Sequence, residues 1–390
     1  MNAIMNTYAR FPLTLVRGKG ARAWDDQGRE YLDFISGIAV NTLGHAHPQL
    51  IEALSEQAGT MLHCSNLFHI PKQQQLAEQL CSLSGLDAVF FCNSGAEANE
   101  GAIKLVRKFF HDANAPRRTI ITAAGSFHGR LLATLTATGQ DKVKVGFDPL
   151  PPGFVHVPRN DIEALKLAVN AQTAAVLLEP LQGEGGVHIA DTSYLQAVRT
   201  LCDEHGLLLM LDEVQTGIGR CGSMFAFEQA GIVPDVLTLA KGLGGGVAIG
   251  AMLASEKVAA SFGPGTHGST FGGNPLACTA ALTVLDVIKS EHLLSNVQQR
   301  GEQLLLGLRD LAIRFPVIRQ VRGQGLLIGA QLSVEAAPLI AAAREMGLLI
   351  LMAGPNVLRF LPPLNVTAEE VDEALTIVAT VLAHTLEEGK

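Results

Sequence analysis

Two short apolar runs, each leading to a polar side chain, constrain the fold of this chain more than any other feature. Residues 207–211 are apolar and lead to Asp212, and residues 236–240 are apolar and lead to Lys241, which glycines follow at once. Apolar runs of about five residues between polar and glycine residues are typical of strands buried on both faces of a parallel sheet. Since ligands of such sheets bind at the carboxyl ends of the strands, we expect a carboxylate and an amine to meet at one binding edge.

A lysine in that position favours one kind of chemistry. Burial at the end of a strand lowers the pKa of a lysine and makes its neutral, nucleophilic amine more available. A nucleophilic amine beside an aspartate that can pair with a pyridinium nitrogen is what pyridoxal phosphate requires of a protein. The residues around Asp212 and Lys241 therefore predict a pyridoxal phosphate site.

Composition and charge narrow the class of protein. The chain has 390 residues, 48 % of them hydrophobic and 17 % charged, which is enough for two domains with a large core. Its net charge of −8, with no block rich in lysine or arginine, argues against nucleic acid as a partner. No apolar run approaches the roughly 20 residues that span a membrane, and the N-terminus has no signal-peptide pattern. Six scattered cysteines without a CxxC pair indicate reduced thiols, so we expect a soluble, cytoplasmic protein.

A turn of small residues is a candidate phosphate site. The apolar residues 88–92 predict a buried strand, and Ser94, Gly95 and Ala96 then open a helix. Ser94 followed three residues later by Glu97 is a capping-box pattern. Such a turn exposes backbone N–H groups and the positive end of the helix dipole, which suits phosphate. The alternative is that Ser94 only caps the helix, and the turn alone does not decide between the two.

Three further loops carry side chains suited to a ligand site at the same sheet edge. One contains Phe127, His128 and Arg130 and suits a cofactor and a carboxylate, although Phe127 could also be a core aromatic and Arg130 a surface charge. Glu184 lies among glycines and is either a turn residue or a charge held close to a ligand. A later glycine-rich loop carries two adjacent hydroxyls, Ser269 and Thr270, which suit phosphate contacts.

Two patterns that suggest other ligands are rejected. His45 and His47 could indicate a metal, but no third ligand stands at a recognisable zinc spacing, so we expect no metal site. Residues 217–222 match the GxGxxG pattern of dinucleotide-binding proteins. However, residues 212–216 separate them from the preceding strand and no helix clearly follows, so a nicotinamide cofactor is disfavoured.

The order of the predicted elements indicates an α/β fold. Strands and helices alternate from about residue 85 to residue 260, which calls for a mainly parallel sheet. Residues 22–34 predict a hairpin, and residues 139–158 look irregular because they are rich in Gly and Pro. The C-terminal part is predicted to be α+β, with helices at 291–314, 335–346 and 368–387 and strands at 325–332, 348–351 and 357–360.

Six motifs resemble those of the class III aminotransferases, which depend on pyridoxal phosphate. They cover nearly the whole chain in the order and spacing of that family, at residues 91–100, 126–130, 179–186, 211–220, 240–242 and 267–275. Within the family the chain is most similar to the bacterial acetylornithine aminotransferases. The resemblance implies an aspartate-aminotransferase-like α/β fold (fold type I), with a large, mainly parallel-sheet domain at 46–275. Residues 1–45 and 276–390 would form a smaller α+β domain.

The resemblance also implies roles for the residues around the cofactor. Lys241 would hold the cofactor covalently and then move the proton between substrate and cofactor. Asp212 would keep the pyridine nitrogen protonated. The other contacts would be ring walls from Phe127 and Val214, a hydrogen bond near the phenolic oxygen from Gln215, and phosphate contacts from Ser94, Gly95, Ala96 and Thr270. Thr270 would come from the neighbouring subunit, which implies a homodimer.

For the substrates, the resemblance implies two arginines with different partners. Arg130 would hold the α-carboxylate of an acylornithine in a bidentate manner, and Arg359 would hold the α-carboxylate of 2-oxoglutarate or glutamate. Glu184 would neutralise Arg359 while the amine donor is bound, and Ser269 would lie near the substrate. Ile38 stands where ornithine aminotransferases place a tyrosine that holds a free α-amino group, so an apolar residue there suits an acylated nitrogen.

The reaction implied by this resemblance is the transfer of the δ-amino group of N2-acetyl-L-ornithine to 2-oxoglutarate. Its products are N-acetyl-L-glutamate 5-semialdehyde and L-glutamate, and it is a step of arginine biosynthesis. N-Succinylornithine, N-succinyl-diaminopimelate, and GABA or another ω-amine are alternative donors. A non-catalytic ligand-binding relative is disfavoured, because a binding module has no use for Asp212 beside Lys241.

Overall fold

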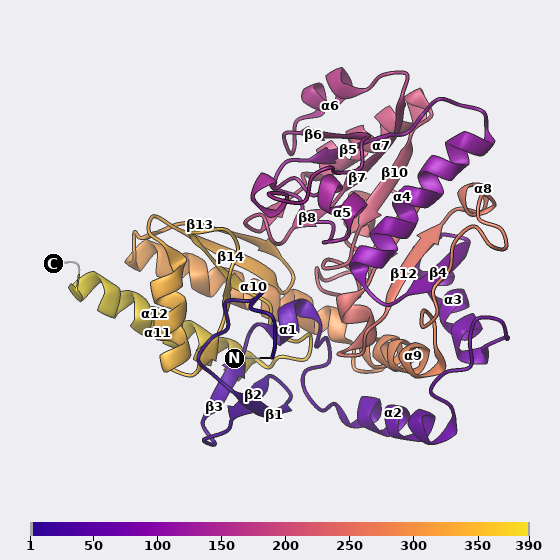
Figure 1. Ribbon diagram of the computed structural model, residues 1–390. Helices are drawn as coiled ribbons and strands as arrows, with labels where there is room; N and C mark the ends of the chain where they lie inside the picture. Colours follow the sequence, from indigo (N-terminus) through magenta and orange to yellow (C-terminus); the bar gives the residue numbers. More distant parts are fainter. Residues whose placement is uncertain (1–2, 389–390) are drawn as a thin grey trace.

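The computed structural model describes residues 3–388, and its largest element is a sheet of seven strands (Figure 1). The strands lie in the order β4-β12-β11-β10-β7-β5-β6. Their bounds are β4 (Ala88–Cys92), β5 (Thr119–Ala123), β6 (Phe154–Val157), β7 (Thr173–Leu178), β10 (Leu208–Asp212), β11 (Val236–Leu239) and β12 (Gly250–Ala254). Strand β12 is antiparallel to β4 and β11, and the other neighbouring pairs are parallel. The predicted mainly parallel sheet is therefore confirmed.

The central strands are buried on both faces. Along β10, Leu209 and Leu211 pack into one apolar cluster, whereas Leu208 and Met210 pack into another on the opposite face. The first cluster includes side chains of α7 (Thr192–His205) and α9 (Pro275–Ser290), and the second those of α4 (Gly95–Asp112) and α5 (Leu132–Ala137). Because side chains alternate along a strand, Asp212 lies on the same face as Met210, toward α4.

The two ends of the chain meet in a second group of elements with two four-stranded sheets, β1-β2-β3-β15 and β13-β14-β17-β16. Strand β15 from the C-terminal part pairs with β3 from the N-terminal part. The strands are β1 (Leu15–Lys19), β2 (Arg22–Asp25), β3 (Glu30–Asp33), β13 (Ile318–Gln324), β14 (Leu327–Leu332), β15 (Leu348–Leu349), β16 (Leu351–Met352) and β17 (Val357–Phe360). The helices are α10 (Leu293–Arg314), α11 (Ala336–Glu345) and α12 (Ala368–Glu388). The predicted hairpin at 22–34 and the three predicted C-terminal helices are confirmed.

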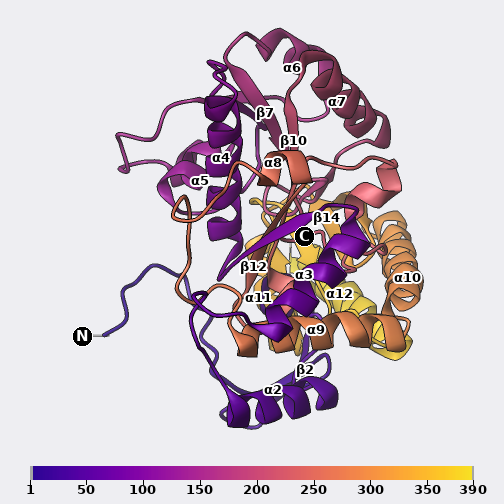
Figure 2. The ribbon, with the colours of Figure 1, turned by 90° about the vertical axis from the view of Figure 1, so that its right-hand side faces the viewer.

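The remaining elements are mostly short. Figure 2 shows α2 and α9 at the end of the molecule opposite α6 and α7. The bounds are α1 (Ser36–Ala39), α2 (Pro48–Thr60), α3 (Pro71–Ser84), α6 (Ile162–Ala168), α8 (Glu256–Ala259), β8 (Leu181–Gln182), β9 (His188–Ile189), η1 (Asp141–Val143), η2 (Ala226–Ala230) and η3 (Lys241–Gly244). Within residues 3–388, no helix combines the length and apolar character needed to cross a membrane.

Three expectations about strands are corrected. Residues 139–158 contain β6, an edge strand of four residues, one of them the exposed His156, and its signal is too short to stand out among Gly and Pro. The prediction at 325–332 missed β13, which pairs antiparallel with β14 and has a polar sequence with a single fully buried residue. The predicted strand at 348–351 is divided between β15 and β16, which belong to different sheets.

Candidate active site

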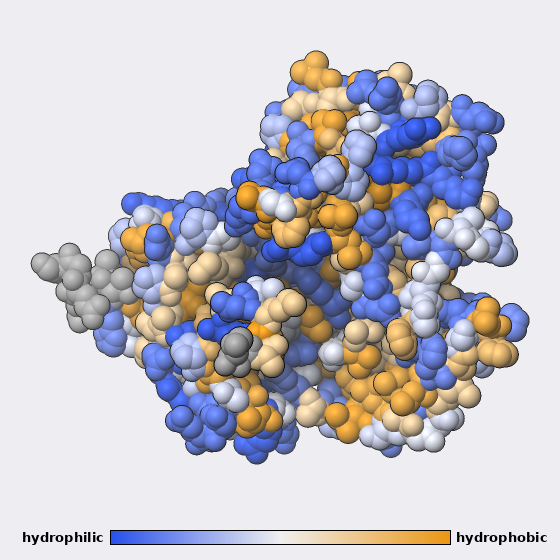
Figure 3. Space-filling view, in the orientation of Figure 1, coloured by the Kyte–Doolittle hydropathy of each residue, from blue (hydrophilic) through white to orange (hydrophobic). Residues whose placement is uncertain are grey.

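Asp212 and Lys241 lie at the carboxyl ends of two neighbouring parallel strands, β10 and β11. Both side chains line a cavity of about 450 Å³, and other lining residues follow β4, β5 and β7 at the same edge of the sheet. In Figure 3 the surface is hollowed between the two groups of elements, and hydrophilic residues gather there. The structure thus brings together the carboxylate and the amine that the strand pattern places at one edge.

The carboxylate of Asp212 is buried and held by three donors. Its Oδ2 accepts hydrogen bonds from Asn99 Nδ2 at 2.7 Å and from His128 Nδ1 at 2.8 Å, and its Oδ1 accepts one from the Val214 N–H at 3.0 Å. Thr238 in turn donates to Asn99 Oδ1 at 2.7 Å. A buried network of this kind fixes the orientation of a charge, so Asp212 presents a fixed negative charge to the cavity.

Sequence reasoning did not select Asn99, and it included His128 only as part of a candidate loop, without a role of its own. Asn99 is buried on α4 beside the apolar Ala98, Ala102 and Ile103. A polar residue on an apolar helix face was an available signal, because buried polar side chains need partners. The ring of His128 is also buried, and its Nε2 has no partner among the described residues. For His128 the available signal was its place in the loop between Phe127 and Arg130, rather than a pattern of its own.

The amine of Lys241 lies in surroundings that disfavour its charged form. Burial lowers the pKa of Lys241, although the nearby carboxylate of Glu184 opposes this effect. The backbone of Lys241 has φ +41°, an uncommon conformation for a residue with a side chain. Thr42 donates a hydrogen bond to the carbonyl of Gly242 at 2.9 Å and so holds the segment that follows the lysine. A lowered pKa makes the neutral, nucleophilic amine more available at neutral pH.

The start of α4 forms one end of the cavity. Ser94 is the N-cap and accepts a hydrogen bond from the Glu97 N–H at 3.2 Å. The carboxylate of Glu97 accepts the N–H of Asn93 at 2.6 Å, so the reciprocal bond reaches one residue further back than in an ordinary capping box. Gly95 and Ala96 line the cavity. Since N–H groups in the first turn of a helix have no intrahelical acceptor, these two amides are suited to an anion.

The glycine at the start of α4 is required by the space around it. A Cβ atom at Gly95 would lie 2.6 Å from Cγ1 of Val214. Val214 and Phe127 both line the cavity with apolar surface, and the N–H of Phe127 donates to Glu179 Oε1 at 2.8 Å. Burial, together with the charge of Asp212, raises the pKa of Glu179 well above its usual range. Sequence reasoning did not select Glu179, which lines the cavity directly after β7.

Two arginines near the cavity differ in their burial and in their partners. Arg359 is 2 % exposed and forms an ion pair with Glu184, with Nη1 to Oε1 at 2.6 Å and Nη2 to Oε2 at 3.3 Å. Burial opposes ionisation of Glu184, but the charge and hydrogen bonds of Arg359, together with Lys241 and Gln215, outweigh burial, and the pKa of Glu184 is lowered. Arg130 is exposed, lines the cavity, and has its guanidinium carbon 5.7 Å from the centre of the Phe127 ring. Gln215 also lines the cavity and its Nε2 lies 3.4 Å from Glu184 Oε1.

Four predicted residues lie outside the set of described residues that line this cavity, namely Arg359, Ser269, Thr270 and Ile38. Ser269 accepts hydrogen bonds from Asn93 Nδ2 at 3.2 Å and from the Gly272 N–H at 2.9 Å. Thr270, the next residue, is exposed. Ile38 is 41 % exposed, whereas Val40, two residues later, lines the cavity.

The two histidines that suggested a metal have other partners. His45 Nε2 lies 2.7 Å from Asp33 Oδ2, and His47 Nε2 lies 3.2 Å from Glu291 Oε1. Among the side chains described by the structure, those of residues 3–384, no group of three or more His, Cys, Asp or Glu could hold a metal ion.

Comparisons with known proteins cover nearly the whole chain. The family model of the class-III aminotransferases matches residues 3–382. An acetylornithine aminotransferase of Thermosynechococcus vestitus is 56 % identical, with 98 % of this chain and 95 % of that protein covered. An acetylornithine aminotransferase of Halalkalibacterium halodurans is 54 % identical, with 98 % of both chains covered.

Solved structures agree with this result. The N-acetylornithine aminotransferase of Stenotrophomonas maltophilia has a TM-score of 0.86 and 44 % identity, and 98 % of each chain is covered. An ornithine aminotransferase of Toxoplasma gondii, with PLP at partial occupancy in its active site, has a TM-score of 0.96 and 34 % identity. That match covers 99 % of this chain and 93 % of the other.

Proposed function

The chain belongs to the class III aminotransferases, and on this premise we propose that it transfers the δ-amino group of N2-acetyl-L-ornithine to 2-oxoglutarate. The products are N-acetyl-L-glutamate 5-semialdehyde and L-glutamate, a step of arginine biosynthesis. The Glu184–Arg359 ion pair beside Lys241 carries this proposal. A site that accepts an amine donor and a dicarboxylate in turn needs a cation that is neutralised for one and free for the other. The relatives named as acetylornithine aminotransferases support the choice of donor.

As a member of this family the chain is a transaminase dependent on pyridoxal phosphate, and the residues present fit that cofactor. We infer that Asp212 pairs with the ring nitrogen and that Gly95 and Ala96, with Ser94, bind the phosphate. Phe127 and Val214 would cover the two faces of the ring. Gln215 lines the cavity and would donate a hydrogen bond from its Nε2 near the phenolic oxygen.

Each of these residues around the cofactor then has a chemical role. The bound cofactor supplies an electron sink for the negative charge that develops when a C–H bond of the substrate breaks. Lys241 takes that proton and returns it to the acceptor carbon, which its lowered pKa favours. The negative charge of Asp212 keeps the ring nitrogen protonated. The apolar surfaces of Phe127 and Val214 exclude water from the reacting atoms.

Substrate selection is divided between the two arginines. Arg130 binds the α-carboxylate of the acylated donor, and Glu184 neutralises Arg359 during that half-reaction. When the dicarboxylate binds, Glu184 moves away from Arg359, and Arg359 then binds the α-carboxylate of the dicarboxylate. Ser269 accepts a hydrogen bond from Asn93, which lines the cavity, and we propose that its hydroxyl contacts the substrate. Apolar side chains along the cavity suit an uncharged acyl group, namely Val40, Leu181, Val247 and Ile249.

A comparison of donors tests the proposal. We expect kcat/KM with 2-oxoglutarate to be at least about tenfold higher for N-acetylornithine than for ornithine, because ornithine would bring a second cation against an apolar wall. N-Succinylornithine, N-succinyl-diaminopimelate and GABA belong to the same panel. A preference for ornithine or GABA would contradict the proposed donor and leave the transaminase assignment unaffected.

Replacing Arg130 by Ala is expected to lower kcat/KM for N-acetylornithine by about 10²-fold, the range for losing a bidentate arginine–carboxylate contact. The value for glutamate should change much less, because its α-carboxylate is assigned to Arg359. Half-reactions with each donor, followed by the absorbance of the cofactor, measure the two effects separately. Arg309→Ala, an exposed arginine on α10, is the control for loss of charge. The reverse ranking would exchange the roles of the two arginines.

We further propose a cytoplasmic homodimer in which Thr270 of one subunit contacts the phosphate in the other. Support comes from exposed apolar side chains on the segment after α2 and on the loop that carries Thr270, namely Met61, Leu62, Leu67, Phe68 and Phe271. In Figure 3, hydrophobic residues also gather over α2 and α9. The free thiols of all six cysteines support a reducing compartment.

We propose residues 46–275 as the large domain and residues 1–45 and 276–390 as the small domain, with α9 as the helix that links them.

A further inference from the structure

The loop at 183–187 carries Glu184 and lies against one rung of the small sheet. Arg322 of β13 is the register partner of Gly329 in β14, and Gly329 is the register partner of Arg359 in β17. Residues directly opposite each other in antiparallel strands project from the same face. The rung therefore presents the guanidinium groups of Arg322 and Arg359 toward the loop. Gly329, which has no side chain, lies between the two arginines.

Arg322 binds the backbone of this loop. Its Nε donates to the carbonyl of Gly186 at 3.0 Å and to that of Val187 at 2.9 Å, and its Nη2 donates to Gly186 at 2.6 Å. Its Nη1 donates to Gln320 Oε1 at 2.7 Å and to Gln331 Oε1 at 2.6 Å. Among the side chains of residues 3–384 Arg322 has no ion-pair partner, so its donors hold two carbonyl groups of the loop and two neighbouring amides.

The same part of the loop is strained and enclosed. Val187 has φ +56°, which is rare for a β-branched residue and persists only where the surroundings impose it. A Cβ atom at Gly329 would lie 2.8 Å from Cβ of Val187, and one at Gly183 would lie 1.6 Å from Oε1 of Gln215. The loop is thus pressed between β14 on one side and Gln215 on the other, and its backbone has little room to shift.

We propose that Arg322 is a positioning residue for substrate alternation, which rests on the proposed function above. By fixing the carbonyls of Gly186 and Val187, Arg322 keeps the Glu184 backbone in register with Arg359. The side chain of Glu184 alone then moves when a dicarboxylate replaces the amine donor. The apparent affinity of the dicarboxylate falls as the fraction of molecules in which Glu184 still occupies Arg359 rises. Holding the loop in place therefore favours the donor over the dicarboxylate.

Replacing Arg322 by Ala tests this proposal, because the proposal predicts tighter binding of a dicarboxylate, whereas a general loss of structure would weaken it. Glutarate, a dicarboxylate without an amino or keto group, should bind the holoenzyme about threefold to tenfold more tightly, because Glu184 competes less for Arg359. The ratio of kcat/KM for N-acetylornithine to that for glutamate should fall by a similar factor. Calorimetry measures the first effect and half-reaction kinetics the second. Arg319→Ala, an exposed arginine on the same strand, is the matched control and should change neither.

Two further variants keep the proposal testable if Arg322→Ala folds poorly. Arg322→Lys retains the charge but cannot reach both carbonyls with the same geometry, and Gly329→Ala pushes on Val187. Both should tighten glutarate binding. Weaker or unchanged glutarate binding, or an equal loss with both donors, would show that Arg322 only stabilises the fold. If the parent enzyme does not use N-acetylornithine, the proposed function fails, whereas the glutarate measurement still decides the role of Arg322.

Discussion

Replacing Lys241 by Ala is expected to lower the rate of transamination by more than about 10³-fold, because one side chain supplies both the covalent attachment and the proton transfer. Lys241 lies at the end of β11 beside Asp212, and burial lowers the pKa of its amine. Methyl in place of the aminobutyl chain removes the nucleophile and the base together. The visible absorbance that arises when pyridoxal phosphate is joined to a lysine should disappear as well. Turnover measured with N-acetylornithine and 2-oxoglutarate, together with an absorption spectrum, tests both effects.

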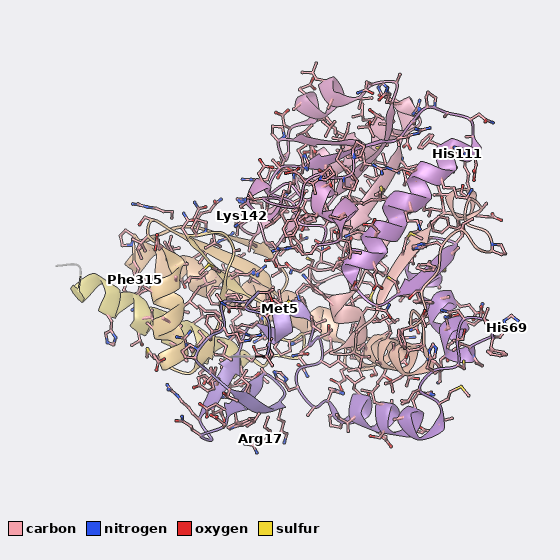
Figure 4. All side chains as sticks on the ribbon, in the orientation of Figure 1. Met5, Arg17, His69, His111, Lys142 and Phe315 are labelled. Carbon is pink, nitrogen blue, oxygen red and sulfur yellow. The ribbon has the colours of Figure 1, made fainter. Side chains whose placement is uncertain are left out.

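The control for this variant is Lys142→Ala. Lys142 is exposed, lies at the outline of the molecule in Figure 4 and is not among the described residues that line the cavity. Its replacement should leave both turnover and spectrum unchanged. Addition of a small primary amine should restore part of the activity of Lys241→Ala, because it can take over the proton transfer. A Lys241→Ala enzyme that turned over at the parent rate would overturn the assignment of this residue.

Much of the sheet and of its ligand edge could be predicted because local sequence determines both. A strand buried on both faces is apolar along most of its length, so β7, β10 and β11 are visible as apolar runs. The residue that follows each run is placed at the sheet edge by the strand itself. The strand pattern alone therefore assigns Asp212 and Lys241 to the same edge of the sheet.

The sequence does not mark contacts that depend on register between distant strands. Arg322 and Arg359 share a rung only because β13 and β17 both pair with β14, and no local pattern fixes that pairing. The polar strand β13 was missed because most of its residues are exposed or only partly buried, and it therefore has no apolar run. Asn99 was missed for a related reason, since its partners Asp212 and Thr238 come from strands more than a hundred residues away along the chain.

Replacing Asp212 by Asn should lower kcat by about 10²–10³-fold while the cofactor stays bound, a range typical of removing one preorganised electrostatic contact. The amide has nearly the same shape as the carboxylate but carries no negative charge to keep the ring nitrogen protonated. It also cannot accept equally well from Asn99, His128 and Val214, which donate to Asp212 in the parent protein. Steady-state kinetics give the loss in kcat, and absorbance at saturating pyridoxal phosphate shows whether the cofactor is retained.

The same substitution at the opposite edge of the sheet separates chemistry from stability. Asp235 precedes β11, accepts the Leu209 N–H at 2.7 Å and pairs with Arg199 at 2.8 Å. Asp235→Asn should therefore lower the free energy of unfolding and leave kcat close to the parent value. Asn99→Ala should give an intermediate loss of kcat, because His128 and Val214 still hold the carboxylate of Asp212. If Asp212→Asn and Asp235→Asn lowered kcat equally, the effect at Asp212 would be one of stability, and its charge would have no special part in the reaction.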